Sequence, residues 1–449
     1  MANVIRLRKG LNINLKGRAS EQVSKAVVSG EYALVPDGFV GVTPKVVVHE
    51  GDYVKAGDAI FVNKHYPDVK FSSPVSGQVV AVERGERRKV LCVKVKAENE
   101  QHYQGFDTLD VKAAEGSQVI DLLLKAGLFG YINQLPYAVS TNPTVMPKAI
   151  FVSALRDMPL AADFEVELKG NEEAFQTGLT ALSRIAKTYL GIGAKQQAAA
   201  LVNAKNVEVN VFDGPCPAGN VGVQVNHINP VNKGEVVWTV NPSAVIFFGR
   251  LFVTGKVDLT RTIAVAGSMV KEPSYVSTLV GTPLSVILDS KLTTKEHVRI
   301  INGNPLTGVK SSLNDFLSPC ASEVTVIPEG DNVNEILGWI MPRFGQFSTS
   351  KSYFSWLCKG KEYDLDARIK GGERHMIMSG EYDKVLPMDI YAEYLIKAII
   401  TGDIDRQEQL GIYEVSPEDF AVAEFVDSSK LELQRIVRDG LNVLRKENA

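Results

Sequence analysis

Short runs of strand-forming residues alternate with turn signals between about Val40 and Val95. Gly51 and Gly57 each precede an aspartate, a pair that favours tight turns because glycine accepts positive φ and aspartate bonds the local backbone. The stretch SPVSGQVVAV then turns the chain into a further strand. The strand positions between these turns are apolar: Val46, Val47, Val48, Val54, Ile60, Phe61 and Val62. This pattern predicts a small all-β barrel-sandwich.

A helical period replaces the strand period from Gly116 onward. QVIDLLLKAGLF repeats apolar residues at a spacing near 3.6, and Gly127 is expected to end this helix. Residues 171–191 predict a second helix, with Asn171 as its N-cap and Gly191 as its end. Apolar or alternating runs predict strands at 148–155 and 207–212. The most apolar segment, AVIFFG at 244–249, also predicts a buried strand. Alternating helices and strands are typical of an α/β layer.

Two further units follow this layer. Residues 261–308 place short strands around a helix-like TLVGTPLSVILD segment and resemble a β-grasp ligand-binding module. From about Asn332 the pattern is mixed, and it ends in helices. SPED, beginning at Ser416, is a helix start with serine as N-cap and proline at the first helical position. One predicted helix, 390–400, carries an apolar stripe made of Ile390, Tyr391, Tyr394, Leu395, Ala398 and Ile399.

The length of 449 residues favours three or four domains. We predict an N-terminal barrel-sandwich hybrid domain over 1–105, an α/β domain over 106–258, a β-grasp module over 259–330 and a largely helical C-terminal domain over 331–449. The fold class is therefore a multidomain mixture of α+β and α/β units.

The two turn-containing half-motifs of the first domain resemble the swinging-arm carriers of biotin or lipoate. Such carriers hold the modified lysine on a tight hairpin between small or apolar neighbours. Here the intervening segment is NKHYPDVKFS, which is longer, contains Pro67, and gives neither Lys64 nor Lys70 those neighbours. We expect the fold to be kept without the arm.

Charge and hydropathy exclude several classes of function. A net charge of −3 gives no bulk attraction to nucleic acid or anionic lipid. No segment reaches the ~18 apolar residues of a membrane span, and the N-terminus MANVIRLRKG carries charge where a signal peptide needs an apolar core. The four cysteines fall in no metal-ligand spacing, so reduced thiols in a soluble intracellular protein are expected.

Catalytic motifs are scarce. The six histidines are scattered without HxxxH or HExxH spacing, and there is no GxSxG, Walker A or helix-opening GxGxxG motif. The richest Gly-Pro segment, FDGPCPAGNVG over 212–222, could cradle a phosphate or flavin with backbone amides, or could simply turn a strand into a helix. Cys216 within it is a structural residue or, as the alternative, a nucleophile.

Several long blocks together resemble one family. AIFVSALRDMPLAAD at Ala149, VNVFDGPCPAGNVG at Val209, VVWTVNPSAVIFFGRLFVTG at Val236, IAVAGSMVKEPSYV at Ile263 and EYDKVLPMDI at Glu381 resemble the A subunits of the bacterial sodium-translocating NADH:quinone oxidoreductase. The resemblance implies a peripheral subunit on the cytoplasmic face of the inner membrane. Its implied partners are the other subunits of a six-subunit complex, some of them membrane-embedded, that passes electrons from NADH to quinone and exports Na⁺.

The same resemblance connects the chain to the flavin-carrying subunit of complex I and the C subunit of the Rnf complex. Those relatives carry a GxGGAxFPT flavin loop, whereas residues 127–138 here read GLFGYINQLPYA. Bulky Phe129 and Tyr131 stand where glycines would let backbone approach a flavin. The cysteine spacing also excludes the clustered ligands of the Rnf-type iron–sulfur centres. We therefore expect no cofactor in this chain, no catalytic residue and no metal, with flavins and iron–sulfur in other subunits.

Quinone is the one small molecule that this chain is expected to meet. The candidate contacts are the aromatic and polar residues Phe129, Tyr131, Tyr137, His227, Phe247 and Phe248. The alternative is that these aromatics are only core. At the level of function, the alternatives are a free-standing flavin- or quinone-dependent oxidoreductase and a biotinyl or lipoyl carrier.

Overall fold

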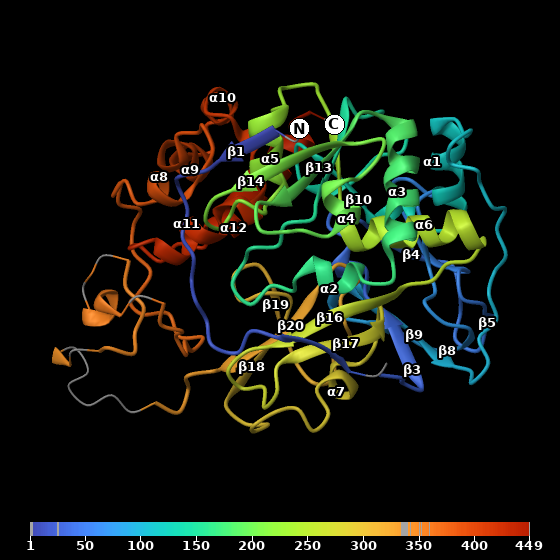
Figure 1. Ribbon diagram of the computed structural model, residues 1–449, viewed down its shortest axis with the longest axis horizontal. Coiled ribbons are helices and arrows are strands. Elements are labelled where there is room, and N and C mark those ends of the chain that lie inside the picture. Colours follow the sequence, from blue (N-terminus) through green and yellow to red (C-terminus); the bar gives the residue numbers. More distant parts are fainter. Residues whose placement is uncertain are drawn as a thin grey trace.

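The computed structural model describes residues 3–24, 27–333, 340–341, 343–349, 351, 353–358 and 360–448 of the chain. Figure 1 shows two large sheets stacked one above the other, with the blue barrel-sandwich strands beside them and the red C-terminal helices at the opposite end. The candidate site lies where these parts meet.

The N-terminal barrel-sandwich is confirmed. One of its two small antiparallel sheets has the order β3 (Glu31–Leu34), β9 (Val90–Ala97), β8 (Gly77–Arg84), β5 (Tyr53–Val54). The other has the order β4 (Pro44–Val46), β6 (Ala59–Asn63), β7 (Lys70–Ser72). Short 3-10 turns η1 (Pro36–Gly38) and η2 (Glu86–Arg88) interrupt the loops. The interior faces of both sheets supply a buried apolar core.

A seven-stranded sheet forms the centre of the molecule. Its order is β1 (Asn3–Arg6), β14 (Glu208–Asp213), β13 (Thr188–Gly193), β12 (Ala149–Ser153), β15 (Val237–Val240), β10 (Ile132–Leu135), β11 (Val139–Ser140). The first five strands are parallel, and β10 and β11 are antiparallel to their neighbours. The predicted strands at 148–155 and 207–212 are thus confirmed.

Helices cover both faces of this sheet. On one face α3 (Glu172–Ile185) packs against α1 (Gly116–Lys125) and α6 (Pro242–Thr254), and Ile150 of β12 joins their core. On the other face, Phe151 packs with Val225 of α5 (Val221–Ile228). The remaining helices of this part are short: α2 (Phe164–Leu168), η3 (Phe129–Tyr131) and α4 (Ala199–Val202). A parallel sheet covered on both faces is the doubly wound arrangement.

The strand predicted at 244–249 is wrong, because these residues lie within α6. Asn241 caps this helix by accepting a hydrogen bond from the Ser243 amide, Pro242 occupies its first turn, and Gly255 ends it with φ +64°. A helix buried on all sides is apolar on all sides, so an apolar run alone does not distinguish it from a buried strand.

The second predicted helix begins as expected and ends too late. α3 stops at Ile185, and Gly191 lies in β13, where it pairs with Ser153 of β12. Asn171 is the N-cap residue, but its side chain bonds Glu167 and Arg250 instead of the helix amides. The end of α1 is as predicted, with Gly127 at φ +69°.

The second large sheet has six strands. Its order is β19 (Val309–Ser311), β18 (Val298–Asn302), β20 (Glu323–Pro328), β16 (Thr260–Ala266), β17 (Ser274–Leu279), β2 (Ser20–Ser24). Only part of the helix-like segment TLVGTPLSVILD is helical. Its first two residues belong to strand β17 (Ser274–Leu279), and the helix is limited to α7 (Leu284–Ile287).

The N-terminal segment links the two large sheets. β1 pairs with β14, and β2 pairs with β17 more than 250 residues away in sequence. Figure 1 shows this blue segment leaving the upper sheet and running down one side of the molecule to the lower sheet.

The C-terminal part ends in helices, as predicted. These are α8 (Tyr382–Val385), α9 (Ala392–Thr401), α10 (Ile404–Gln409), α11 (Ala421–Val426) and α12 (Leu433–Glu447), with 3-10 turns η5 (Phe354–Leu357), η6 (Ile412–Glu414) and η7 (Pro417–Phe420). Ser416 and Asp419 form the expected capping box. No helix in the described ranges is long and apolar enough to cross a membrane.

The apolar stripe predicted on α9 is partly wrong. Leu395 and Ala398 are buried, but the flanking tyrosines Tyr391 and Tyr394 are 70% and 52% exposed. Ala392 and Ile396 complete the buried face instead. A tyrosine tolerates exposure because its ring ends in a polar hydroxyl, so its place in an apolar stripe is ambiguous.

Candidate functional site

A cavity of about 840 Å³ opens at the carboxyl ends of two central strands. The chain runs from β12 outward to β13 and β14, then returns to place β15 on the other side of β12. The crevice outside the carboxyl ends of two such strands is where open α/β sheets bind ligands. Ser153 at the end of β12 and Asn241 directly after β15 both line the cavity.

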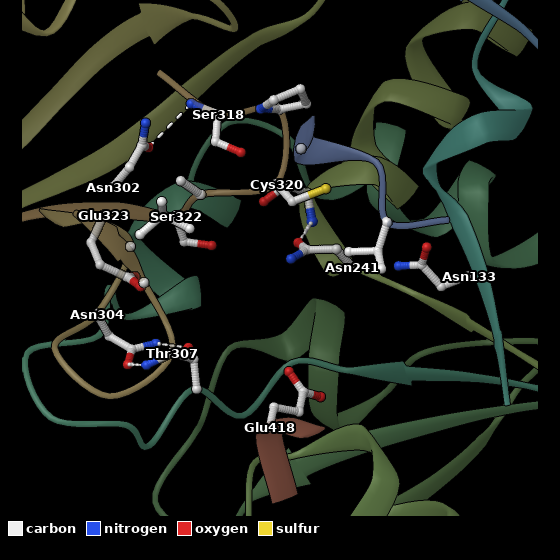
Figure 2. Close-up of a pocket in the computed structure, with 18 of the residues that line it drawn as sticks. Asn133, Asn241, Asn302, Asn304, Thr307, Ser318, Cys320, Ser322, Glu323 and Glu418 are labelled. Atoms are coloured by element: carbon white, nitrogen blue, oxygen red, sulfur yellow. Dashed lines mark hydrogen bonds between the residues drawn. The ribbon is translucent and has the colours of Figure 1, made fainter. Parts of the chain in front are cut away.

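The other walls come from distant parts of the chain. The loop at the start of β20 contributes Cys320 and Glu323, and the C-terminal part contributes Glu418. Figure 2 shows Cys320 close to Asn241 on one wall, Glu323 and Asn304 on a second, and Glu418 across the space from Cys320. Regions that lie far apart in sequence therefore enclose one space.

Tyr131 and Phe247 give the cavity an aromatic wall. Their ring centroids are 5.8 Å apart at an interplanar angle of 79°, and the Tyr131 ring also meets Phe39 of the barrel-sandwich at 5.0 Å. Both side chains are almost fully buried. Edge-to-face packing of this kind holds the rings in fixed orientations.

A buried ionic network lies beside this wall. The Arg156 guanidinium donates to Glu167 Oε2 at 3.0 Å and to Ser243 Oγ at 2.9 Å. Ser243 Oγ donates to the same Glu167 oxygen at 2.8 Å, and Arg261 Nη2 donates to Ser243 Oγ at 3.1 Å. Arg156 of the loop after β12 and Arg261 of β16 thus share one carboxylate through the first turn of α6.

Three buried polar atoms of cavity-lining residues have no hydrogen-bond partner among the described residues: the donors Tyr131 Oη and Arg261 Nε, and the acceptor Asp157 Oδ1. Tyr131 is 6% exposed and Arg261 is 3% exposed, so bulk water does not reach either side chain freely. Leaving such groups unpaired costs free energy, and buried donors without partners are uncommon.

Burial in the cavity wall raises the pKa values of several lining groups. Burial raises the pKa of the Tyr131 phenol and of the Cys320 thiol, so both groups keep their protons near neutral pH. Burial raises the pKa of the Asp157 carboxyl to about 6, against bonds from the amides of Gly219 and Ala218. Partial enclosure and the neighbouring Asp419 carboxyl both raise the pKa of Glu418.

The structure brings two of the candidate quinone contacts together, Tyr131 and Phe247. Phe129 lies behind them, fully buried, with its ring 5.5 Å from Trp238. Phe248 is buried in the helix core. Neither of these two residues lines the cavity described here.

The two predicted polar donors lie elsewhere. His227 is on α5, where its Nδ1 is 2.9 Å from the Val223 carbonyl. Tyr137 lies in the loop after β10, where its carbonyl accepts from Arg438. Neither lines this cavity. Two polar residues that do line the cavity, Asn241 and Arg261, were not predicted from the sequence. The Asn-Pro start of α6 could have indicated Asn241, whereas no sequence signal indicates Arg261.

The loop between α1 and β10 contacts another domain. A Cβ on Gly127 would lie 2.0 Å from Ser72 Oγ, and one on Gly130 would lie 2.2 Å from the Phe71 ring. Ser72 Oγ also donates to the Ala126 carbonyl at 2.6 Å. Gly127 and Gly130 therefore let strand β7 of the barrel-sandwich approach this loop closely.

The Gly-Pro segment 212–222 connects β14 to α5, and its end lines the cavity. Cys216 within it is buried, its Sγ is 3.6 Å from Met158 Sδ, and burial raises the pKa of its thiol. A nucleophile needs thiolate character and access, so this environment favours the structural reading. Among the described residues no three histidine, cysteine or acidic side chains are grouped to hold a metal ion.

Three family models match successive parts of the chain. Residues 5–98 match the NqrA N-terminal barrel-sandwich hybrid domain, residues 114–257 the NqrA second alpha/beta domain, and residues 262–312 the NQRA C-terminal domain.

Curated relatives match over the full length. Proteins of Neisseria meningitidis serogroup A and Yersinia pestis bv. Antiqua, each named as the A subunit of the Na(+)-translocating NADH-quinone reductase, are 33% identical over 99% of this chain and all of theirs. Among solved structures, an NAD⁺-reducing [NiFe]-hydrogenase in the H2-reduced state covers 41% of both chains at 14% identity. Its TM-score of 0.32 is too low to carry an argument.

Proposed function

The chain belongs to the family of A subunits of the Na⁺-translocating NADH-quinone reductase, and from this premise we propose that it is a peripheral scaffold subunit whose interdomain cavity receives a quinone head group. In this proposal the electron transfer takes place in the whole complex, and this chain is a structural subunit that binds its partner subunits.

The observation that carries the quinone proposal is the cavity wall formed by Tyr131 and Phe247 at the switch point of the seven-stranded sheet. A quinone ring is flat and apolar on its faces and polar at two opposite oxygens. Two edge-to-face aromatic rings beside hydroxyl and amide groups offer matching surroundings.

Titration of a short-chain quinone into the full-length chain tests this proposal. Phe247→Leu is expected to weaken saturable binding by about 3- to 10-fold, corresponding to roughly 0.5–1.5 kcal/mol of aromatic contact. Phe248→Leu is the matched control, because it makes the same change in the next residue of α6 but away from the cavity. If both variants bind as tightly as wild type, the cavity is not the quinone site.

Attachment to the membrane is proposed to come through partner subunits at the cytoplasmic face. The described helices offer no membrane span, and the net charge of −3 gives weak attraction to anionic lipid. The chain expressed alone should stay in the supernatant after centrifugation of membranes, and should pellet with them when its partners are co-expressed. Sedimentation with membranes in the absence of partners would refute this account.

The alternative functions predict different spectra and masses. A free-standing flavoprotein would release flavin on acid precipitation, and a carrier protein would show a lysine adduct in its intact mass. We propose neither, since Ser72 and Phe71 of the barrel-sandwich pack against the glycine loop and neither Lys64 nor Lys70 has the neighbours of a carrier lysine. We propose that flavins and iron–sulfur centres belong to other subunits.

We also propose a more specific structural relationship for two of the domains. The central sheet would derive from the fold of the flavin-carrying protein of complex I, and the six-stranded sheet would derive from a β-grasp module. The doubly wound topology and the degenerate glycine loop support the first assignment.

A further inference from the structure

We propose that one basic and apolar surface of the chain docks on an acidic, apolar surface of a partner subunit. This docking face consists of residues 8–18 and of the described residues between 340 and 378. The inference rests on the proposed function, because it names the surface through which this chain would attach to its complex.

The N-terminal part of the docking face is a row of cations without counter-charges. Residues 8–18 contain four basic side chains and no acidic one. Arg8, Lys9, Lys16 and Arg18 are all exposed, and in the described part of the chain none of the four forms an ion pair. Their charges are therefore available to a partner.

The second part of the docking face exposes large apolar side chains. Ile369 is 71% exposed, and the rings of Phe344 and Phe354 lie together in solvent with their centroids 5.9 Å apart. Others that are at least half exposed are Ile340, Met341, Leu357 and Ile377. Exposed apolar groups gathered beside polar ones mark a protein or membrane contact.

Backbone hydrogen bonds join the two parts into one face. Leu15 pairs with Tyr363 in a parallel bridge. The Lys16 amide donates to the Tyr363 carbonyl at 3.0 Å, and the Tyr363 amide donates to the Asn14 carbonyl at 2.8 Å. Figure 1 shows the blue N-terminal segment and the orange loops on the same side of the molecule. The row of cations therefore borders the apolar loops.

The charge of this face selects the kind of partner. Residues 8–18 and 340–378 together contain eleven basic and four acidic side chains, a net charge of +7, whereas the whole chain has a net charge of −3. Such segregation of charge within one chain favours association with an acidic surface, because complementary potentials attract and orient the two partners.

The acids within the loops favour a protein over a lipid surface. Glu362, Asp364 and Glu373 are exposed beside the apolar residues. Anionic head groups would repel these carboxylates, whereas a protein can place a cation opposite each of them. Exposed rings such as Phe344 and Phe354 also suit the centre of a protein interface, where aromatic residues are enriched.

Sedimentation with membranes tests the docking face. Purified full-length chain is added to washed membranes from cells that express the partner subunits but not this chain, and the bound fraction is measured against concentration. Arg8→Glu combined with Lys9→Glu should weaken binding by about 10-fold or more, because attraction becomes repulsion. Ile369→Ser should weaken it by about 3- to 10-fold, because an apolar contact is lost.

Matched controls make the same substitutions on other elements. Lys55→Glu combined with Lys125→Glu reverses two exposed cations that have no ion pair among the described residues. Val253→Ser alters an apolar side chain that is 53% exposed on α6. Figure 1 shows β5, α1 and the end of α6 on the side of the molecule away from the orange loops. These variants should bind as wild type, and unchanged thermal unfolding verifies that every variant folds.

The outcomes separate this inference from the proposed function. If the wild type does not bind the partner-containing membranes, attachment through partners is itself refuted. If the wild type binds and both test variants bind equally well, attachment stands and the docking face is overturned. A loss in at least one test variant, absent from its control, supports the face. Protein-free vesicles of phosphatidylglycerol that bind the wild type as tightly as the membranes would make lipid the occupant and overturn the proposal.

Discussion

At the residue scale, the cavity concentrates polar groups whose burial opposes folding. Tyr131 Oη and Arg261 Nε are buried without hydrogen-bond partners among the described residues. An unpaired buried polar group costs roughly 1–3 kcal/mol of stability.

Removing the Tyr131 hydroxyl should therefore stabilise the ligand-free protein. Tyr131→Phe keeps the ring contacts with Phe39 and Phe247 and deletes only the unpaired oxygen. We expect an increase of about 1 kcal/mol in the free energy of unfolding, measured by urea denaturation without quinone. A clear loss of stability would mean that the hydroxyl is already satisfied in the folded protein.

The buried Asp419 should make stability fall as pH rises. Burial raises the pKa of its carboxyl to about 6, against hydrogen bonds from Ser416 and Asn220. The folded protein therefore holds this proton more tightly than the unfolded chain, whose aspartates titrate near ~3.9. The contribution is fully present below about pH 4 and is lost as pH rises through about 6.

Urea denaturation between pH 4 and 7 measures this effect. Asp419→Asn, which does not titrate, should lose less stability than wild type across that interval, by up to about 3 kcal/mol. Parallel curves for the two proteins would show that the carboxyl titrates as it does in the unfolded chain.

At the scale of elements, the loop between α1 and β10 is a docking surface for strand β7. Phe71 stacks on Phe61 at 4.7 Å and lies 4.4 Å from Phe39, so the barrel-sandwich presents an aromatic cluster to this loop. The loop admits it only because Gly130 has no side chain. The contact places the Tyr131 ring at the cavity.

Gly130→Ala should disturb this contact. The added methyl would meet the Phe71 ring at 2.2 Å, so one of the two elements must move. We expect a loss of about 1–3 kcal/mol in the free energy of unfolding, typical of overpacking. Gly105→Ala, whose added methyl meets nothing within 4 Å, is the control and should change stability by less than about 0.5 kcal/mol. Similar losses in both variants would disprove tight packing at Gly130.

At the scale of the whole molecule, buried charge connects the two large sheets. Glu167 lies in α2 beside the seven-stranded sheet, and it faces Arg156 at 3.0 Å and Arg261 of β16 at 3.8 Å. All three side chains are at most 10% exposed. Because Arg156 follows β12 of the seven-stranded sheet and Arg261 lies in β16 of the six-stranded sheet, the carboxylate helps to set how the sheets meet around the cavity.

Glu167→Gln should be strongly destabilising. The substitution keeps the size of the side chain but removes the carboxylate that contacts both buried arginines, a change that costs roughly 3–5 kcal/mol when a buried pair is broken. Glu21→Gln removes the exposed partner of Lys169 and should cost less than about 1 kcal/mol. Thermal and urea unfolding of both variants measure the difference. Equal stabilities would show that the contacts of Glu167 with the two arginines do not stabilise the fold.

The sequence by itself determined what depends on near neighbours. Turn glycines and strand residues between Val40 and Val95 predicted the barrel-sandwich, and Ser416 and Asp419 marked a helix start that the structure confirms. These signals act through backbone sterics and hydrogen bonds within a few residues. Long blocks such as VNVFDGPCPAGNVG also identified the family, which full-length relatives confirm.

Only the tertiary structure decided what depends on distant contacts. The AVIFFG run is compatible with a buried strand or a buried helix, and the packing of α6 against α3 selects the helix. Pairing of β1 with β14 and of β2 with β17 has no local signal. The cavity joins Tyr131, Arg261 and Cys320 from separate sheets and loops. Sequence spacing carries no information about these tertiary contacts, because long-range contacts are determined by how whole faces of helices and sheets pack and not by local propensity.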